Sequence, residues 1–225
     1  MGSVSGVGVL DKAMAVLGAV GAGERSLAGI VAATGLSRAT AHRLAVALET
    51  HGLLRRDDEG RFSLGLGLVG LGHAASEAIP GWLDARAELA WLREQTGESV
   101  QLFVRDGDER VCVESFEAPH ELRTIVPVGA RLPLSQGSGG RALLASPSPP
   151  GGSPSPADGT PAWVESVAER QPGVASVSAA VRGPGGRVVA AVSVSGPIER
   201  TTRRPGARYG AAVAEAATRI SARLT

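Results

Sequence analysis

Residues 26–50 read SLAGIVAATGLSRATAHRLAVALET, and this stretch decides the fold. Ser26 and Ser37 are placed as N-caps, because a serine hydroxyl can accept a hydrogen bond from a backbone N–H in the first turn of a helix. Gly35 stands between the two caps, and a glycine between short helices permits a sharp crossing. The spacing predicts a helix-turn-helix with helices at residues 27–34 and 38–50.

The second predicted helix has two faces of different chemistry. Its apolar residues follow the i, i+3, i+4, i+7 spacing of a helix that packs on a core: Ala41, Leu44, Ala45 and Leu48. A helix-turn-helix places the N-terminal end of its second helix in the major groove of DNA. We therefore expect base-edge or phosphate contacts from the opposite face and its flanks: Ser37, Arg38, Ala39, Thr40, His42 and Arg43. Arginine suits guanine because its guanidinium fork matches two acceptors on one base edge.

The sequence around these helices predicts a winged helix. Residues 7–20 have helical apolar spacing, and two short strands, residues 53–56 and 61–64, are joined by the polar turn Asp57-Asp58-Glu59-Gly60. This acidic tip argues against deep insertion into the minor groove, so we expect phosphate contacts from the wing arginines: Arg55, Arg56 and Arg61. The alternative is an interaction module that binds no DNA, with the arginines of the second helix as an ordinary solvated face.

Beyond the wing, helices alternate with strands of period two. Strands are predicted at residues 99–105, 110–117, 122–127, 131–134, 174–181 and 187–195. Helices are predicted at residues 66–80, 82–96, 138–145, 162–170 and 206–224. Residues 146–161, SPSPPGGSPSPADGTP, are of low complexity and cannot build a core. The fold class is therefore α+β, with a winged helix-turn-helix domain at residues 1–65, a linker helix at residues 66–80 and a larger domain at residues 81–225.

Composition limits the classes of function. The 225 residues carry 23 Lys and Arg against 22 Asp and Glu, so any DNA contact must come from a local basic patch. Cys112 is the single cysteine, which excludes an internal disulfide and fits a reducing compartment. The sequence shows no signal-peptide pattern and no apolar stretch near the roughly 20 residues that span a bilayer. We expect a cytoplasmic protein without membrane association.

Two groups of small polar residues predict a ligand pocket in the C-terminal half. The glycine-rich helix start at residues 137–140 exposes backbone N–H groups that can hold a carboxylate or a phosphate. Ser176 and Ser178 share one face of a strand, as do Ser193 and Ser195 on the next, which predicts a sheet with a small polar face. The candidate effector-binding residues are Ser138, Gly139, Gly140, Ser176, Ser193 and Ser195. The alternatives are a helix start that binds only water and a solvent-facing sheet.

The sequence matches catalytic and metal-binding motifs poorly. Ser138 lacks the G-x-S-x-G context of a hydrolase nucleophile, and the four histidines and Cys112 match no metal-ligand spacing. We expect no catalytic residue, no metal and no cofactor, so the protein is not expected to be an enzyme. A hydrolase that uses Ser138 is the alternative. Cys112 is expected to be a small core residue on a strand. Three glutamates are expected to be surface or strand-edge charges: Glu98, Glu114 and Glu117.

Several motifs together resemble the IclR family of transcriptional regulators. In the N-terminal half they are VLDKA at residues 9–13, LSRATAHRL at 36–44 and FSLG at 62–65. In the C-terminal half they are LPL at 132–134, RALLA at 141–145 and VAAVSVSGP at 189–197. The resemblance implies a GAF-like effector-binding domain, an antiparallel sheet with flanking helices. It also implies homodimers joined through the N-terminal domains and often paired into tetramers.

The resemblance also implies a position for the effector pocket. The family's pocket residues fall on Ser138, Gly139, Gly140, Ser193 and Ser195. Ser176 stands where some members have a cysteine. An acidic pocket residue of some members falls near Ser166, and Glu165 or Glu169 could substitute for it.

We expect a regulator that binds a double-stranded DNA operator and responds to a small polar metabolite. Residues 171–178, QPGVASVS, are similar to the actinobacterial branch that controls amino-acid biosynthesis genes. The alternative is a constitutive DNA-binding repressor with a vestigial sensor domain. It is favoured by residues 146–161, which replace ordered helical structure that the family has at this point.

Overall fold

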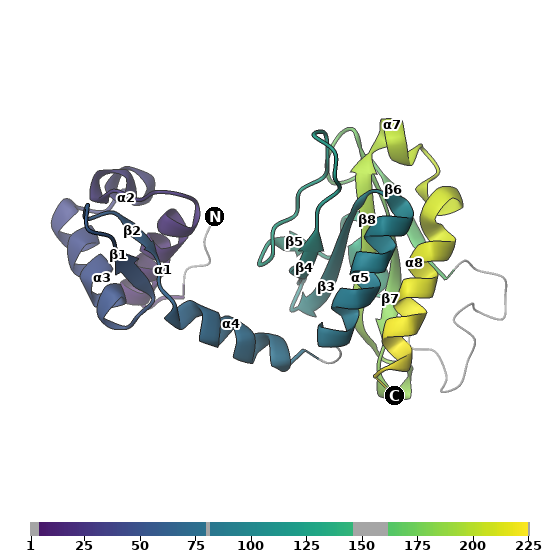
Figure 1. The fold of residues 1–225 in the computed structure, drawn as a ribbon, viewed down its shortest axis with the longest axis horizontal. Helices are drawn as coiled ribbons and strands as arrows, with labels where there is room; N and C mark the ends of the chain where they lie inside the picture. The colour runs from purple at the N-terminus through teal and green to yellow at the C-terminus, as the bar shows by residue number, and fades with distance from the viewer. Residues whose placement is uncertain (1–4, 80–81, 146–161, 225) are drawn as a thin grey trace. The chain divides into compact units, whose positions relative to one another are not determined.

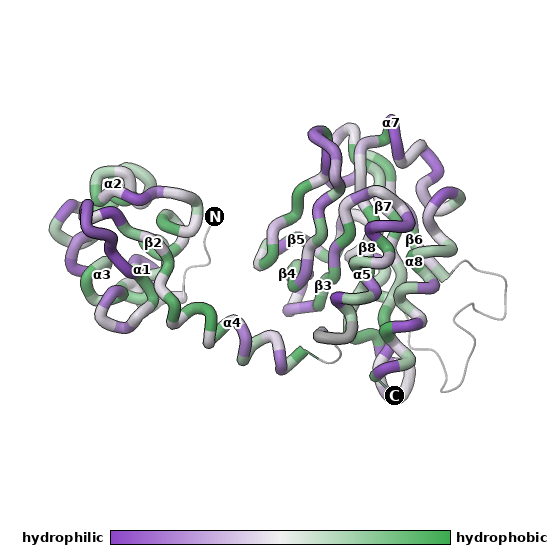
Figure 2. The backbone as a smooth tube through the Cα atoms, in the orientation of Figure 1, coloured by the Kyte–Doolittle hydropathy of each residue, from purple (hydrophilic) through white to green (hydrophobic). Residues whose placement is uncertain are grey.

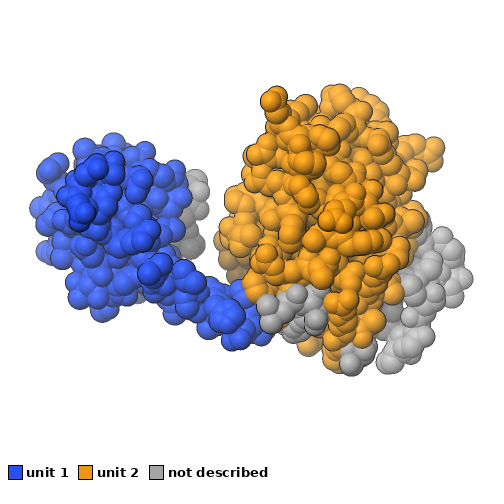
Figure 3. Space-filling model, in the orientation of Figure 1, with its two compact units in different colours: residues 1–78 blue, residues 79–225 orange. Residues whose placement is uncertain are grey.

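The protein is described as a computed structural model. The chain divides into two compact units, unit 1 (residues 1–78) and unit 2 (residues 79–225), which are coloured separately in Figure 3. The low-complexity stretch at residues 146–161 lies outside the described residues. The structure describes residues 5–79, 82–145 and 162–224.

Unit 1 is a helix-turn-helix followed by a two-stranded wing and one more helix. Its elements are α1 (Gly8–Gly21), α2 (Leu27–Thr34), α3 (Arg38–Thr50), β1 (Leu54–Arg56), β2 (Phe62–Leu64) and α4 (Gly67–Glu77). The Ser26 hydroxyl accepts a hydrogen bond from the N–H of Gly29 at 3.0 Å. The Ser37 hydroxyl accepts one from the N–H of Thr40 at 3.3 Å, so both predicted N-caps are confirmed. Gly35 ends α2 at a φ of 68°, a left-handed conformation that favours glycine.

A small aliphatic core holds unit 1 together. The predicted apolar stripe of α3 is confirmed, because its four residues are buried: Ala41, Leu44, Ala45 and Leu48. The stripe packs with residues of α1, α2 and the wing: Val16, Val20, Ile30, Leu54 and Phe62. Each large aliphatic or aromatic side chain buried in this way contributes roughly 1.5–3 kcal/mol. The core thereby fixes which face of α3 remains outside.

Gly65 joins the wing to α4 at a point where two backbones touch. A Cβ added at Gly65 would lie 2.1 Å from the carbonyl oxygen of Gly52, while one added at Gly70 in α4 would meet nothing within 4 Å. We expect Gly65→Ala to lower the free energy of unfolding of unit 1 by about 1–3 kcal/mol, because backbone atoms must shift. Gly70→Ala is the matched control and should leave stability unchanged or raise it. Denaturant unfolding of both variants tests this, and equal stabilities would contradict it.

Unit 2 is a single antiparallel sheet with helices on its faces, which confirms the predicted α+β class. Its elements are α5 (Trp82–Thr96), β3 (Ser99–Asp106), β4 (Glu109–Phe116), β5 (Arg131–Pro133), α6 (Gly137–Leu143), β6 (Val164–Val167), β7 (Val174–Arg182), the 3₁₀ turn η1 (Pro184–Gly186), β8 (Val188–Pro197), α7 (Ile198–Thr201) and α8 (Pro205–Ala222). The six strands follow the order β5-β4-β3-β8-β7-β6. Figure 1 shows β5, β4 and β3 side by side at one edge of this sheet.

The two faces of this sheet differ in chemistry. On one face lie α5 and α8, side by side, and between them and the strands is the main core of unit 2 (Figure 1). The strands contribute alternate residues to that core: Val100, Leu102, Val177, Ala179, Val192 and Val194. Because strand residues alternate between faces, the intervening residues, Gln101 and the predicted serines among them, lie on the other face. That face is covered by α6 and by the loop before β5, through a second cluster: Phe103, Cys112, Val126, Leu134, Ala142, Leu143 and Ala191.

Two secondary-structure predictions are wrong. Residues 162–170 were expected to form a helix, but Val164–Val167 is the edge strand β6, paired antiparallel with β7. Pairing with β7 overrides the local helical pattern of these residues. Residues 122–127 were expected to form a strand but do not. Other residues form the backbone hydrogen bonds at this edge of β4. The N–H of Cys112 donates to the Ala130 carbonyl, and the carbonyl of Cys112 accepts a hydrogen bond from the N–H of Gly129.

Buried charges are a second correction. Glu98 and Glu114 were expected to be surface or strand-edge charges, but they are buried, at 2% and 7% exposed. Each is paired with an arginine: Glu98 with Arg200 at 2.7 Å and Glu114 with Arg86 at 3.0 Å. Cys112 is fully buried, as predicted, and burial raises the pKa of its thiol to about 12. None of the helices in the described part of the chain is long and apolar enough to cross a bilayer.

Candidate functional site

The outer face of α3 presents cationic side chains without partners. Arg38, Ala39, His42 and Arg43 are exposed, and Thr40 is half-buried. Among the described residues, no hydrogen bond or ion pair involves the side chains of Arg38, His42 or Arg43. Ser37, which was also predicted to contact DNA, already has hydrogen-bond partners within the protein. Its hydroxyl caps α3 and forms a 2.9 Å hydrogen bond with the Thr40 hydroxyl. The arginines at the start of α3 are therefore available to a ligand.

The wing arginines, in contrast, are engaged within unit 1. Arg55 donates to the Ser63 hydroxyl at 3.0 Å. Arg56 lies over the Phe62 ring and forms an ion pair with Glu49 at 3.4 Å. Arg61 pairs with Asp57 at 2.9 Å and with Glu59 at 2.8 Å. Hydrogen bonds from the backbone and guanidinium of Arg61 lower the pKa of Asp57, so this carboxylate stays ionised and the wing offers less free positive charge than α3.

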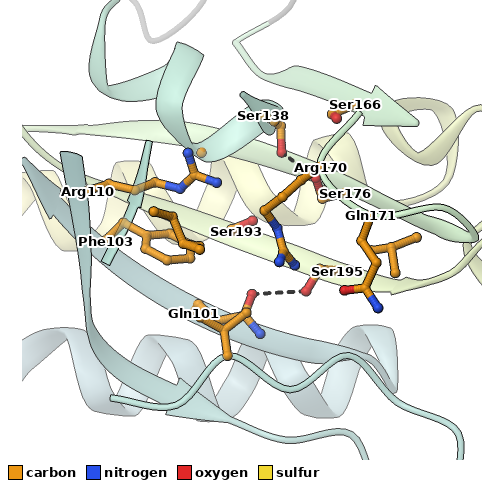
Figure 4. A pocket seen from close by; sticks show the side chains of 15 residues that line it. Gln101, Phe103, Arg110, Ser138, Ser166, Arg170, Gln171, Ser176, Ser193 and Ser195 are labelled. Atoms are coloured by element: carbon orange, nitrogen blue, oxygen red, sulfur yellow. Dashed lines mark hydrogen bonds between the residues drawn. The ribbon is translucent and has the colours of Figure 1, made fainter. Parts of the chain in front are cut away.

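The second predicted site is a hollow on the polar face of the sheet in unit 2 (Figure 4). Strand register places Ser176 opposite Ser195 and Ser178 opposite Ser193. The Ser138 hydroxyl, at the start of α6, lies 2.7 Å from that of Ser176 and 2.8 Å from that of Ser178. Ser178 donates to Ser193 at 2.9 Å. A chain of hydroxyls thus links α6 to the centre of the sheet.

The hollow holds about 430 Å³, its open mouth included. Five of the six predicted effector residues line it: Ser138, Gly139, Ser176, Ser193 and Ser195. Gly140 does not. A Cβ at Gly140 would lie 2.1 Å from the carbonyl oxygen of Leu134, so this position is glycine because α6 packs directly on the backbone before it. Ser166, near which the family resemblance placed an acidic residue of some members, lines the hollow as well.

The two acidic residues considered as substitutes point elsewhere. Glu165 accepts a hydrogen bond from the N–H of Gly206 at 2.7 Å, at the start of α8. Glu169 accepts one from the N–H of Gly137 at 3.0 Å and forms an ion pair with Arg141 at 2.6 Å. The hydrogen bonds from Arg141 are the main cause that lowers the pKa of Glu169. The first N–H of α6 is thus already satisfied from within the protein.

Five further polar or aromatic residues line the hollow and were missed from the sequence: Gln101, Phe103, Arg110, Arg170 and Gln171. Arg110 could have been found, because it lies two residues before Cys112 on a strand and so shares the buried face predicted for the cysteine. Arg170 follows β6, where a helix was expected, and no sequence signal placed it near the serines. No described group of His, Cys, Asp or Glu side chains is suited to a metal ion.

Two family models cover most of the chain. Residues 9–58 match the IclR helix-turn-helix domain, and residues 83–149 and 160–222 match the bacterial transcriptional regulator IclR C-terminal domain. The chain belongs to the IclR family. This family comprises DNA-binding transcriptional regulators, and the family resemblance stated from the motifs is confirmed at this level.

Named IclR-family relatives are transcriptional regulators. The chain is 32% identical over 120 residues to the regulator KipR of Bacillus subtilis, a match that covers 53% of the chain and 48% of KipR. It is 34% identical over 142 residues to the glycerol operon regulatory protein of Streptomyces coelicolor, over 60% of the chain and 55% of that protein. Both matches therefore span about half of the relative's length. The glycerol operon regulatory protein of Streptomyces griseus is 28% identical over 220 residues, 85% of each chain.

Solved IclR structures share the fold. The Thermotoga maritima IclR structure superposes with a TM-score of 0.76 at 23% identity and covers 96% of this chain and 98% of its own. An IclR homolog complexed with 4-hydroxybenzoate, from Microbacterium hydrocarbonoxydans, gives a TM-score of 0.73 at 20% identity, with the same coverage. At these identities the likeness supports the architecture, an N-terminal helix-turn-helix and an antiparallel sheet domain with flanking helices.

Proposed function

We propose that this protein is a sequence-specific, DNA-binding transcriptional regulator whose operator affinity is modulated by a small polar metabolite. The observation that carries the proposal is the outer face of α3, where Arg38, His42 and Arg43 are exposed and unpaired beside a capped helix start. The N-terminal end of α3 would enter the major groove. The wing arginines, of which Arg56 and Arg61 are paired with carboxylates and Arg55 is bonded to a serine hydroxyl, would contribute phosphate contacts only.

The proposed assembly is a homodimer on a pseudo-palindromic operator, because a two-fold protein reads two related half-sites. Unit 1 supports this with apolar side chains exposed on α1 and around α4: Val9, Leu10, Met14, Leu66, Val69 and Leu71. Figure 2 shows the hydrophobic colour in α4. Exposed apolar patches commonly mark protein interfaces. Pairing of dimers into tetramers, and target genes in amino-acid metabolism, belong to the same proposal and rest on the family resemblance of the sequence.

The proposed effector site is the hollow of unit 2, formed by Ser138, Gly139, Ser176, Ser193 and Ser195. It belongs to the proposed effector domain at residues 81–225. A linker helix at residues 66–80 would join this domain to the DNA-binding domain at residues 1–65. Gly140 would act through packing. Regulation requires that the bound effector favours one arrangement of the DNA-binding domains over another. A hydrolytic role is not supported, since Ser138 bonds to serine hydroxyls and none of the described lining residues is a base that could activate it.

Arg43→Ala tests the DNA-binding face. An operator is first selected from random DNA by the full chain, and affinities are then measured by fluorescence anisotropy. We expect the variant to lose about 1–3 kcal/mol of operator binding, since an arginine that reads a base contributes this much. Arg105→Ala, exposed near the end of β3 in unit 2, is the control and should bind as the wild type does. Unchanged operator binding by Arg43→Ala would contradict the assignment, and equal weakening on all sequences would reassign it to phosphate.

A further inference from the structure

The hollow in unit 2 contains positive charge that none of its described lining residues balances. Arg110 and Arg170 line it, and none of the other described lining residues is an aspartate or a glutamate. In Figure 4 the Arg170 guanidinium extends toward Ser193 and Ser195, and the Arg110 guanidinium lies at the side of the hollow, next to the Phe103 ring. Buried charges in folded proteins are normally paired, because removal from water is unfavourable without a partner. The arrangement therefore calls for a negative partner.

Arg110 is held in place without being neutralised. It is 3% exposed, and its Nη1 atom donates to the backbone carbonyls of Pro133 and Gln136. Its guanidinium lies 5.3 Å from the centroid of the Phe103 ring. The Nε atom is buried and has no hydrogen-bond partner in the part of the chain that the structure describes. Two carbonyl bonds and a ring fix the position of the group but leave its charge and one donor unsatisfied.

Arg170 adds a second charge beside the first. Among the described residues, the Arg170 side chain has no hydrogen-bond or ion-pair partner. Burial, and then the positive charge of Arg170, lower the pKa of Arg110 to about 10, which is the effect of a like charge nearby. The group nevertheless remains protonated at neutral pH. The two arginines repel each other unless an anion lies between them.

Gln101 contributes another unsatisfied donor. Its side chain is 1% exposed, and its Oε1 atom accepts a hydrogen bond from Ser195 at 3.0 Å. Its Nε2 atom is buried, and none of the described residues forms a hydrogen bond with it. At the hollow, the buried side-chain atoms without a partner among the described residues are thus both donors, Arg110 Nε and Gln101 Nε2, and the half-buried Arg170 guanidinium adds further donors. A ligand that satisfies them must supply acceptors and negative charge.

We propose that the effector of this protein is a small organic acid whose carboxylate is recognised by Arg170, Arg110 and Gln101. The remaining wall of the hollow is apolar and suits a carbon skeleton: Phe103, Val126, Leu132 and Val174. The serine hydroxyls on β7 and β8 would bind further polar groups of the ligand. This inference rests on the proposed function in that it names the chemical class of effector for the same pocket.

The first test needs no ligand. Gln101→Glu places a carboxylate beside the two arginines and keeps the acceptor for Ser195. We expect its melting temperature to rise, because the internal carboxylate supplies the missing charge. Gln95→Glu, exposed on α5 outside the hollow, is the matched control and should melt as the wild type does. A lower melting temperature for Gln101→Glu would overturn the inference.

The second test is calorimetric titration of the full chain, without DNA, with C3–C6 mono- and dicarboxylic acids, their amides and inorganic phosphate. We expect saturable binding of at least one acid, no binding of its amide, and an affinity at least about tenfold lower in Arg170→Gln, since a charge-assisted hydrogen bond is lost. Arg187→Gln, exposed and outside the hollow, should bind as the wild type does.

Several results would overturn the inference: no acid binds, an amide or inorganic phosphate binds as tightly as the acid, or Arg170→Gln binds the acid with unchanged affinity. Because neither test includes DNA, acid binding without any effect on operator affinity would contradict the proposed function alone. Operator binding without acid binding would contradict this inference alone.

Discussion

Arg200→Ala is expected to lower the free energy of unfolding of unit 2 by about 3 kcal/mol. Arg200, in α7, donates from Nε to Glu98 Oε1 at 2.7 Å and from Nη2 to Glu98 Oε2 at 2.9 Å. Glu98 is 2% exposed, so the substitution leaves a buried carboxylate without its partner. Breaking a buried pair in this way costs about 3–5 kcal/mol, and the 29% exposure of the Arg200 side chain favours the lower end, because water can enter.

The matched control for this prediction is Arg131→Ala. Arg131 also bridges carboxylates, Asp106 at 2.8 Å and Glu109 at 2.6 Å, but its side chain is 50% exposed. A solvent-exposed pair contributes about 0–1 kcal/mol, so this variant should unfold close to the wild type. In denaturant unfolding, the double variant Arg200→Ala with Glu98→Gln should recover part of the loss, since no charge is left buried. Equal losses for Arg200→Ala and Arg131→Ala would show that the burial of Glu98 is not decisive.

Ser193→Leu is expected to abolish the effector response and to leave operator binding intact. Ser193 is 3% exposed on β8 and accepts a hydrogen bond from Ser178 at 2.9 Å. Leucine removes the Ser193 hydroxyl from the lining of the hollow, and its larger side chain fills space that the effector would occupy. Effector binding should therefore weaken roughly a hundredfold or more. Operator binding should persist, because the contacts of α3 lie in unit 1.

Two controls make this result specific. Ser193→Ala removes the hydroxyl without adding bulk and should weaken effector binding less than Ser193→Leu does. Arg43→Ala should show the reverse pattern, with operator binding weakened and effector binding retained. Calorimetry for the effector and anisotropy for the operator measure the two properties separately. A variant with both Ser193 and Ser195 replaced that still responds normally would contradict the assignment of the pocket.

The DNA-binding half was predictable because its determinants are local. Serine caps, a helix-ending glycine and the spacing of Leu44 and Leu48 act within a few residues, and each is found where the sequence placed it. The ion pairs of the wing arginines were harder to predict from the sequence. Arg56 and Arg61 were expected to contact phosphate, and the sequence did not predict that Glu49 and Asp57 form ion pairs with them.

In the C-terminal half, local sequence patterns predicted some features and failed for others. The shared face of Ser193 and Ser195 followed from the two-residue period of a strand and is confirmed by the hollow. Residues 162–170 were misread because only β7, a distant segment, makes them a strand. The two-residue period could place Arg110 on the buried face of Cys112, but not the carbonyls of Pro133 and Gln136 that hold it, more than twenty residues later in the chain. Long-range contacts of this kind carry no signal in a single sequence.

The central claim is that DNA binding and effector binding are linked in one chain. The most direct measurement is fluorescence anisotropy of the full chain on DNA from upstream of its own gene, across a salt series, with excess competitor DNA. The titration is repeated with the acid that calorimetry identifies. The account predicts operator binding that resists the competitor, weakens as salt rises and shifts when the acid is bound. Weak, sequence-independent binding that the acid leaves unchanged would contradict it.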